Sequence, residues 1–218
     1  MEQELREKYA AVKRTIVMSS IAVLSFPGSE VPIRQQLNRI GYISNISYEK
    51  GIREFIGVVQ RLQDAAADIM ALLAGPFQDD NIARELEPIL QQLTNLEHLG
   101  PVCNERKAAF FRDVDVLLFP THQEAEGLVI FEALSQGIPV IALERGCISE
   151  VMGTEGGLVH SDKSTYVEIA FQQIVDWRNN PSTYQQASQN AYSRYLTYRE
   201  KYNKNMVELL ALMANYDQ

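Results

Sequence analysis

VDVLLFPTHQEAEGLVIFEALSQGIPVIAL, residues 114–143, contains two short apolar runs separated by a polar loop and an amphipathic segment. The first run, 114–119, is apolar apart from Asp115, a composition typical of a strand covered on both faces. Residues 128–136 then predict a helix that ends at Gly137. Residues 139–143 predict the next strand. A strand, a helix and a strand in this order favour a right-handed crossover between parallel strands.

The same alternation continues on both sides of this unit. We expect Asn104 to cap one helix and Pro88 to kink or divide another. The whole pattern predicts an α/β fold: a Rossmann-like, doubly wound parallel sheet of about six strands, with helices on both faces and extra C-terminal helices. The further strands are expected over 40–44, 68–75, 96–100 and 156–160, and the further helices over 49–63, about 81–93, 104–111, 166–177, 181–196 and 204–216.

The composition limits the function classes. The chain has 218 residues and a formal net charge of −8. That charge argues against a nucleic-acid binder and against direct contact with anionic lipids. Cys103 and Cys147 are too few and too far apart for a metal motif, so we expect two reduced thiols in a cytoplasmic protein.

The apolar run at residues 15–26 could be mistaken for a targeting signal. The residues before it carry three glutamates, whereas a signal peptide needs a positively charged start. The run is also too short to span a bilayer. We therefore expect a buried strand there.

In parallel sheets, ligands bind in the loops beyond the carboxyl ends of the strands. Here Gly127 opens a helix and lets a ligand approach the backbone closely. The free N–H groups of Gly127, Leu128 and Val129 carry roughly half a positive charge, which favours a phosphate. Glu132 could accept hydrogen bonds from a vicinal diol such as ribose, and Glu124 from hydroxyls beyond the phosphate. A nucleotide sugar has hydroxyls on both sides of its phosphates.

A simpler interpretation exists for some of these carboxylates. Glu124 and Glu126 would be favourable as solvated charges near a helix N-terminus. Glu132 fits that interpretation less well, because it lies inside the apolar sequence LVIFEAL.

The order of these residues resembles a known signature. Glu124, seven residues, Glu132 and then GIPVI are similar to the motif of the retaining glycosyltransferases of family 4, which have the GT-B fold. Downstream, Gly146 and Glu150 are similar to the glycine and glutamate that follow in that family. The resemblance extends over about residues 40–198.

The resemblance implies a role for each site residue. Glu132 would bind the ribose of the donor, and Glu124 would contact the transferred sugar. The amides at 127–129 would face the diphosphate and the sugar. Lys50 matches the lysine that neutralises the diphosphate as it leaves. His122 is a candidate neighbour of the sugar.

Two positions depart from the family pattern. Asn45 stands where many relatives have an arginine, so it can donate to a phosphate but brings no charge. Glu126 stands where an apolar residue is common, which adds a negative charge near the expected sugar pocket.

The resemblance covers only part of a GT-B protein. Residues 40–198 are expected to form the nucleotide-sugar-binding domain and 199–218 a C-terminal helix. Residues 1–39 read as a helix, a strand and a linker, a remnant of or connection to an N-terminal acceptor domain. The segment 44–51 lacks GxGxxG, which argues against a dehydrogenase.

The expected function is therefore that of the donor-binding half of a hexosyltransferase-like enzyme. It would transfer a sugar from a nucleoside diphosphate sugar to a hydroxyl acceptor, with no cofactor and no metal. We expect this chain to be inactive without an N-terminal domain or subunit. Any membrane contact would be made by that domain or subunit only. The alternative is a non-catalytic module that binds a nucleotide or nucleotide sugar.

Overall fold

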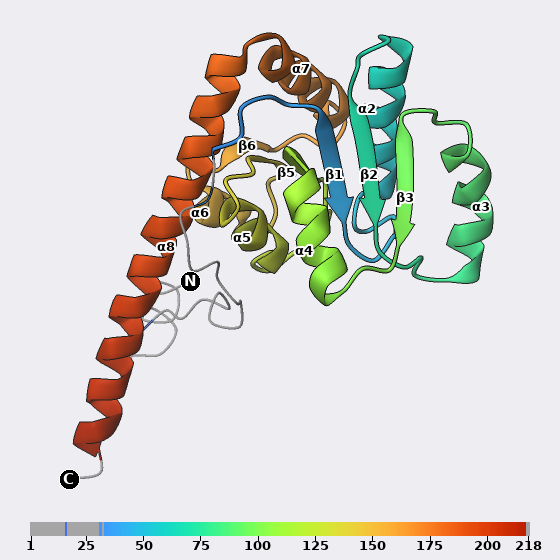
Figure 1. The fold of residues 1–218 in the computed structure, drawn as a ribbon. Helices are drawn as coiled ribbons and strands as arrows, with labels where there is room; N and C mark the ends of the chain where they lie inside the picture. Colours follow the sequence, from blue (N-terminus) through green and yellow to red (C-terminus); the bar gives the residue numbers. More distant parts are fainter. Residues whose placement is uncertain (1–15, 17–30, 32, 217–218) are drawn as a thin grey trace.

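The apolar runs form six strands, as the sequence predicts. The computed structural model describes Ile16, Val31 and residues 33–216; the strand expected over 15–26 lies, apart from Ile16, outside the described residues. All the strand pairs are parallel, in the order β3-β2-β1-β4-β5-β6 (Figure 1). The strands are β1 Arg39–Ile43, β2 Met70–Ala74, β3 Leu96–Gly100, β4 Val116–Phe119, β5 Val140–Leu143 and β6 Gly157–His160.

The helices connect these strands and cover both faces of the sheet. Six of them follow a strand, and the last one follows another helix. They are α2 Ile52–Asp64, α3 Asp80–Leu90, α4 Asn104–Asp113, α5 Leu128–Leu134, α6 Ile148–Met152, α7 Tyr166–Asn179 and α8 Pro181–Tyr216.

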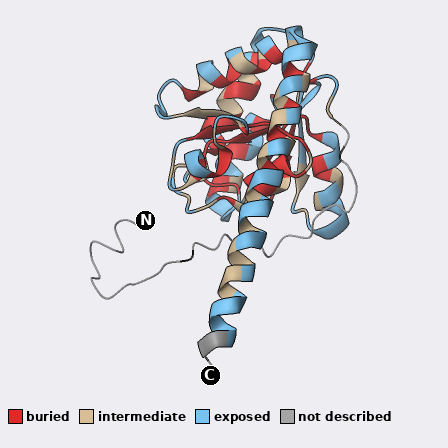
Figure 2. Cartoon of the chain, turned by 90° about the vertical axis from the view of Figure 1, so that its left-hand side faces the viewer, coloured by how far each residue is buried: buried red, intermediate tan, exposed pale blue. Residues whose placement is uncertain are grey.

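Alternate side chains of each buried strand pack on opposite faces. In β4, Val116 and Leu118 belong to the core that α2, α3 and α7 cover. Leu117 and Phe119 belong to the core that α4, α5, α6 and part of α8 cover. The strands in the middle of the molecule, largely buried and red in Figure 2, therefore separate two apolar layers. This three-layer arrangement confirms the doubly wound α/β prediction.

Two helix ends differ from the prediction. Pro88 does not divide α3, because it lies in the last turn of a helix that already ends at Leu90. Leu93 lies beyond that end but is still buried. In α4 the cap position belongs to Cys103, which makes no side-chain cap. Asn104 is instead the first helical residue, with φ of 47°, a left-handed conformation that asparagine tolerates better than most residues.

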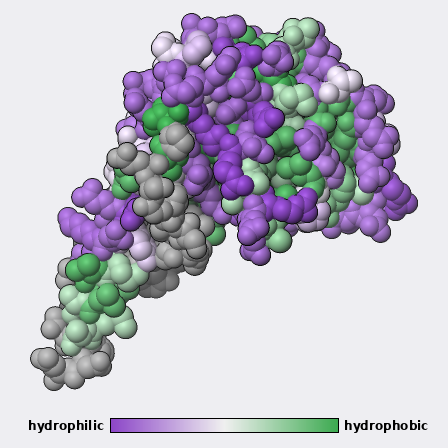
Figure 3. Space-filling model, viewed as in Figure 1, coloured by the Kyte–Doolittle hydropathy of each residue, from purple (hydrophilic) through white to green (hydrophobic). Residues whose placement is uncertain are grey.

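The two predicted C-terminal helices are one continuous helix, α8, of 36 residues. Between them the sequence TYREKYN, residues 197–203, has neither glycine nor proline, so nothing in it interrupts a helix. Ala191 and Tyr195 in the first half of α8 are buried against the domain. The second half extends beyond the body of the domain (Figure 1) and carries exposed apolar side chains, green in Figure 3. They are Val207, Leu210, Leu212 and Met213.

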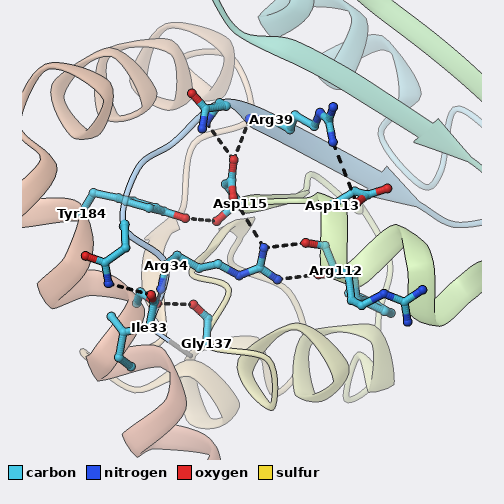
Figure 4. Close-up of polar contacts among 12 residues, drawn as sticks. Ile33, Arg34, Arg39, Arg112, Asp113, Asp115, Gly137 and Tyr184 are labelled. Atoms are coloured by element: carbon cyan, nitrogen blue, oxygen red, sulfur yellow. Dashed lines mark hydrogen bonds and ion pairs between the residues drawn. The ribbon is translucent and has the colours of Figure 1, made fainter. Parts of the chain in front are cut away.

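Asp115 joins the start of β1 to β4 (Figure 4). Its Oδ2 accepts hydrogen bonds from the backbone amides of Asn38, at 2.8 Å, and Arg39, at 2.9 Å. The Arg34 guanidinium lies 3.6 Å from Oδ1. Tyr184, from α8, donates to the backbone carbonyl of Asp115 at 2.8 Å. Burial raises the pKa of the Asp115 carboxyl, although both amides and Arg34 oppose this.

We expect Asp115→Ala to destabilise the domain strongly. It leaves two partly buried amides without an acceptor, which costs about 2–6 kcal/mol at roughly 1–3 kcal/mol for each unsatisfied group. Chemical denaturation at neutral pH measures this loss.

Asp115→Asn is the matched control, because its amide oxygen can still accept from both backbone amides. It should cost clearly less than Asp115→Ala.

The two variants should also differ in their dependence on pH. Because the pKa of the Asp115 carboxyl is higher in the folded state than in the unfolded state, the contribution of this carboxyl to stability falls as the pH rises above about 4. The Asn variant lacks this titration and should gain stability relative to wild type as the pH rises. Equal losses in the two variants would show that the hydrogen bonds to Asp115 contribute little.

Candidate functional site

The candidate site lies where the strand order reverses, between β1 and β4. At such a point the connections that follow the two strands run to opposite faces of the sheet, so the loops beyond the strands leave space for a ligand between them. The loops are held together by the amide of His122, which donates to the carbonyl of Glu49 at 2.8 Å. Gly51, the residue before α2, fits tightly against the carbonyl of Pro120. The sequence-predicted residues 45–50 and 124–129 thus meet at one edge of the sheet.

Lys50 and Glu124, the two predicted catalytic residues, are in direct contact. The Lys50 ammonium lies 3.0 Å from Oε2 of Glu124 and 3.4 Å from the carbonyl of Gln123. The lysine side chain is 33% exposed and the glutamate side chain 20% exposed, so the ion pair is accessible but partly desolvated. The structure therefore brings together residues that are 74 positions apart in the sequence.

Backbone contacts fix the loop that carries Glu124. The amide of Ala125 donates to Oε1 of Glu124 at 3.0 Å, and the amide of Cys147 donates to the carbonyl of Ala125 at 3.0 Å. Gly146 has φ of 54°, and a Cβ there would lie 2.1 Å from the carbonyl oxygen of Glu124. Only glycine lets the two loops approach this closely. The Gly146 motif noted in the sequence thus supports the Glu124 loop.

Glu132 pairs with a residue that the sequence analysis missed. Oε1 of Glu132, in α5, lies 2.6 Å from the ammonium of Lys107, in α4. The other carboxylate oxygen, Oε2, is shielded from solvent and has no hydrogen-bond partner within the described chain. No local signal in the sequence identifies Lys107, because the contact joins two different helices.

The start of α5 matches the predicted anion site in part. Gly127 precedes it in a left-handed conformation, with φ of 73° and no side-chain cap. Within residues 33–216, the amides of Gly127, Leu128 and Val129 donate to no other group. However, α5 has only seven residues, so its dipole is weak and the amides act mainly as individual donors. Asn45 is exposed in the loop after β1.

Glu126 lies where its charge acts on α8. Burial, together with the charges of Glu150 and Glu126, raises the pKa of Tyr198 to about 12. The Tyr198 ring packs against Phe131 of α5, with the ring centroids 5.0 Å apart. The extra charge at position 126 is therefore close enough to act on Tyr198 at the contact between α5 and α8.

The His122 side chain contacts α2 and the loop after β6. Its Nε2 lies 3.1 Å from Oε1 of Glu54, and its Nδ1 lies 3.5 Å from the ammonium of Lys163. Lys163 in turn lies 3.3 Å from the same oxygen of Glu54, a carboxylate that is only 9% exposed. These three residues fasten the site loop to the α2 side of the sheet. Glu54 and Lys163 were not predicted.

Several other features of the described chain bear on function. It contains no group of three or more histidine, cysteine, aspartate or glutamate residues able to hold a metal ion. None of its helices is both long and apolar enough to cross a membrane. Cys103 and Cys147 are both free.

The strand order and the loops at the β1–β4 reversal define a Rossmann-like α/β domain. The sequence model of one family, Glycosyl transferases group 1, matches residues 38–176, more than half of the chain. The chain belongs to this family of glycosyltransferases.

Individual relatives agree with this assignment. The capsular polysaccharide biosynthesis glycosyltransferase CapM of Staphylococcus aureus is 29% identical over 133 residues, which cover 60% of this chain and 34% of CapM. The C-terminal domain of the group 1 glycosyl transferase LpcC from Francisella tularensis superposes with a TM-score of 0.64 at 23% identity, covering 73% of this chain and 85% of that one.

A third comparison is with Anabaena Alr3699/HepE, whose structure was solved in complex with UDP and glucose. It superposes with a TM-score of 0.65 at 18% identity, covering 81% of this chain and 48% of HepE. These likenesses confirm the GT-B type of fold predicted from the sequence. The chain spans about a third to two fifths of the length of the curated relatives it matches, CapM among them.

Proposed function

We propose that this chain is the donor-binding half of a retaining glycosyltransferase, which transfers a sugar from a nucleoside diphosphate sugar to a hydroxyl acceptor. The observation that carries the proposal is the contact of Lys50 with Glu124 at the strand reversal, beside the open amides that precede α5. One cation and several N–H groups suit a diphosphate, while the carboxylates suit hydroxyls. HepE, which shares the fold, binds UDP and glucose, which supports this ligand class.

Each residue has a distinct task in this proposal. The Lys50 ammonium turns from Glu124 to the diphosphate, because the ligand carries the larger negative charge. Glu124, released on one oxygen, accepts hydrogen bonds from the sugar. Glu132 accepts from the ribose, and the amides at 127–129 donate to the phosphates.

The chemistry in this proposal is mainly electrostatic. As the bond between sugar and diphosphate breaks, negative charge builds up on the leaving phosphate, and prepositioned donors stabilise it. Lys50 and the amides provide that stabilisation without a metal ion. Asn45 can add a hydrogen bond but no charge, which leaves Lys50 as the main cation of the site.

The acceptor would come from a second part of the enzyme. Because the curated relatives are longer than this chain, we propose an N-terminal acceptor domain or subunit that closes over the strand reversal. The exposed apolar side chains on the second half of α8 support a partner, because solvated helices seldom expose such side chains together. The acceptor, and any membrane contact, would then belong to that partner, and the complex would be cytoplasmic.

The alternative function is binding of the same ligand without catalysis. In a non-catalytic module, the same residues would bind a nucleotide or nucleotide sugar, and adding the acceptor half would give no transfer. Turnover of a nucleotide sugar by the assembled complex distinguishes the two functions.

The binding claim is tested by a thermal-shift panel of UDP, GDP and ADP. A ligand at about 100 times its Kd stabilises a protein by about 2.7 kcal/mol. For a domain of this size, that raises Tm by roughly 5–10 °C. We expect this shift with at least one of the three. Lys50→Met should reduce it strongly, whereas Lys204→Met, on the exposed part of α8, should not. No shift with any of the three would refute the proposed function.

A further inference from the structure

Lys107 and Glu132 form the closest ion pair at the candidate site. The ammonium lies 2.6 Å from Oε1, and the two side chains are 33% and 20% exposed. At this distance the two opposite charges attract each other directly in a partly desolvated site. Within the part of the chain that the structure describes, Lys107 makes no other ion pair. Its position on α4 therefore directs it to Glu132 alone.

The carboxylate of Glu132 is only half satisfied by this contact. Oε2 is withdrawn from solvent and has no hydrogen-bond partner among the described residues. Such an oxygen is costly to leave unpaired and gains much when a hydroxyl donates to it. The final torsion of a glutamate side chain is soft, so a modest rotation can bring Oε2 to a ligand while Oε1 stays on Lys107.

We propose that Lys107 is a positioning residue for recognition of the ribose. It holds Oε1 of Glu132 and so presents Oε2 as the single acceptor for a ribose hydroxyl of the nucleoside diphosphate. The inference rests on the proposed function, because it assumes that such a ligand occupies the site.

In this proposal Lys107 also has an electrostatic role beside Glu132. A carboxylate beside a diphosphate is repelled by it. A lysine paired with the far oxygen of Glu132 offsets that repulsion, so the diphosphate can bind close to the carboxylate. The two lysines then differ in role. Lys50 leaves Glu124 to bind the diphosphate, whereas Lys107 stays paired with Glu132.

The test compares ribose with deoxyribose in wild type, Lys107→Met, Lys107→Arg and Glu132→Gln. Calorimetry measures the affinities for whichever of UDP, GDP and ADP binds, and for its 2′-deoxy and 3′-deoxy counterparts. A hydrogen bond to a charged group corresponds to a preference of about 10-fold to 100-fold. We expect wild type to show this preference for at least one hydroxyl. Lys107→Met should lower it to about threefold or less, and Lys107→Arg should retain most of it.

The comparison separates positioning from general support of the fold. A merely structural lysine would weaken all the nucleotides equally, so the preference would survive in Lys107→Met, and that result would overturn the inference. A wild type that binds nucleoside diphosphates without any preference for ribose would also overturn it, while the proposed function would stand. A wild type that binds none of them would refute both. If Lys107→Met does not fold, Lys107→Gln takes its place: a lost ribose preference in that variant supports the inference, and a preserved one overturns it.

Discussion

We expect Glu132→Ala to remove most of the stabilisation that nucleoside diphosphates are proposed to give to the wild-type protein. The substitution deletes the carboxylate that is proposed to accept hydrogen bonds from the ribose. A charge-assisted bond of this kind contributes about 1.5–3 kcal/mol, so losing it lowers the affinity by roughly 10-fold to 100-fold. At a ligand concentration about 100 times the wild-type Kd, the Tm shift then falls to between about one half and one sixth of its original value.

The substitution also leaves Lys107 without its 2.6 Å partner. A freed ammonium could attract the diphosphate and hide part of the loss, so Glu132→Gln and the double variant Glu132→Ala with Lys107→Met are needed beside it. Glu87→Ala removes one exposed carboxylate from α3, away from the site, and controls for the change in net charge. A full Tm shift in Glu132→Ala and in the double variant would exclude Glu132 from the nucleotide site.

The sheet could be predicted from the sequence because its evidence is local. The core strands are continuous apolar runs, and the rule for carboxyl ends then places residues 45–50 and 124–132 on the same edge. In contrast, α6 has only five residues, too few for its buried Ile148, Val151 and Met152 to stand out as a periodic pattern. The continuity of α8 was missed because its polar middle segment gives no apolar signal, although nothing in it breaks a helix.

The partners of the site residues could not be predicted, because each contact joins distant segments. Lys50 was identified from the family resemblance, but its ion pair with Glu124 follows from the pairing of β1 with β4. Lys107 reaches Glu132 only because α4 and α5 cover the same face of the sheet. His122 was a candidate neighbour of the sugar, and the contact of its ring with Glu54 of α2 could not be predicted. Residue type and spacing do not contain this information.

Gly51→Ala should be among the most damaging single substitutions in the domain. Gly51 has φ of 79°, and an added Cβ would lie 2.0 Å from the carbonyl oxygen of Pro120 and 2.6 Å from its carbon. The left-handed conformation alone costs about 1–2 kcal/mol, and overpacking adds about 1–3 kcal/mol. We therefore expect a loss of roughly 2–5 kcal/mol in the free energy of unfolding, measured by chemical denaturation.

Gly100→Ala separates the two causes, because Gly100 has φ of 64° but no atom within 4 Å of an added Cβ. It should cost only the conformational part, about 1–2 kcal/mol. The difference between the two variants then measures how tightly the start of α2 is pressed against the loop after β4. The strain in Gly51→Ala is relieved only by moving those segments apart, which separates Lys50 from Glu124. Nucleotide binding should therefore fall in Gly51→Ala, even where the protein remains folded. Equal stability losses in the two variants, with nucleotide binding intact, would mean that this close approach is not what assembles the site.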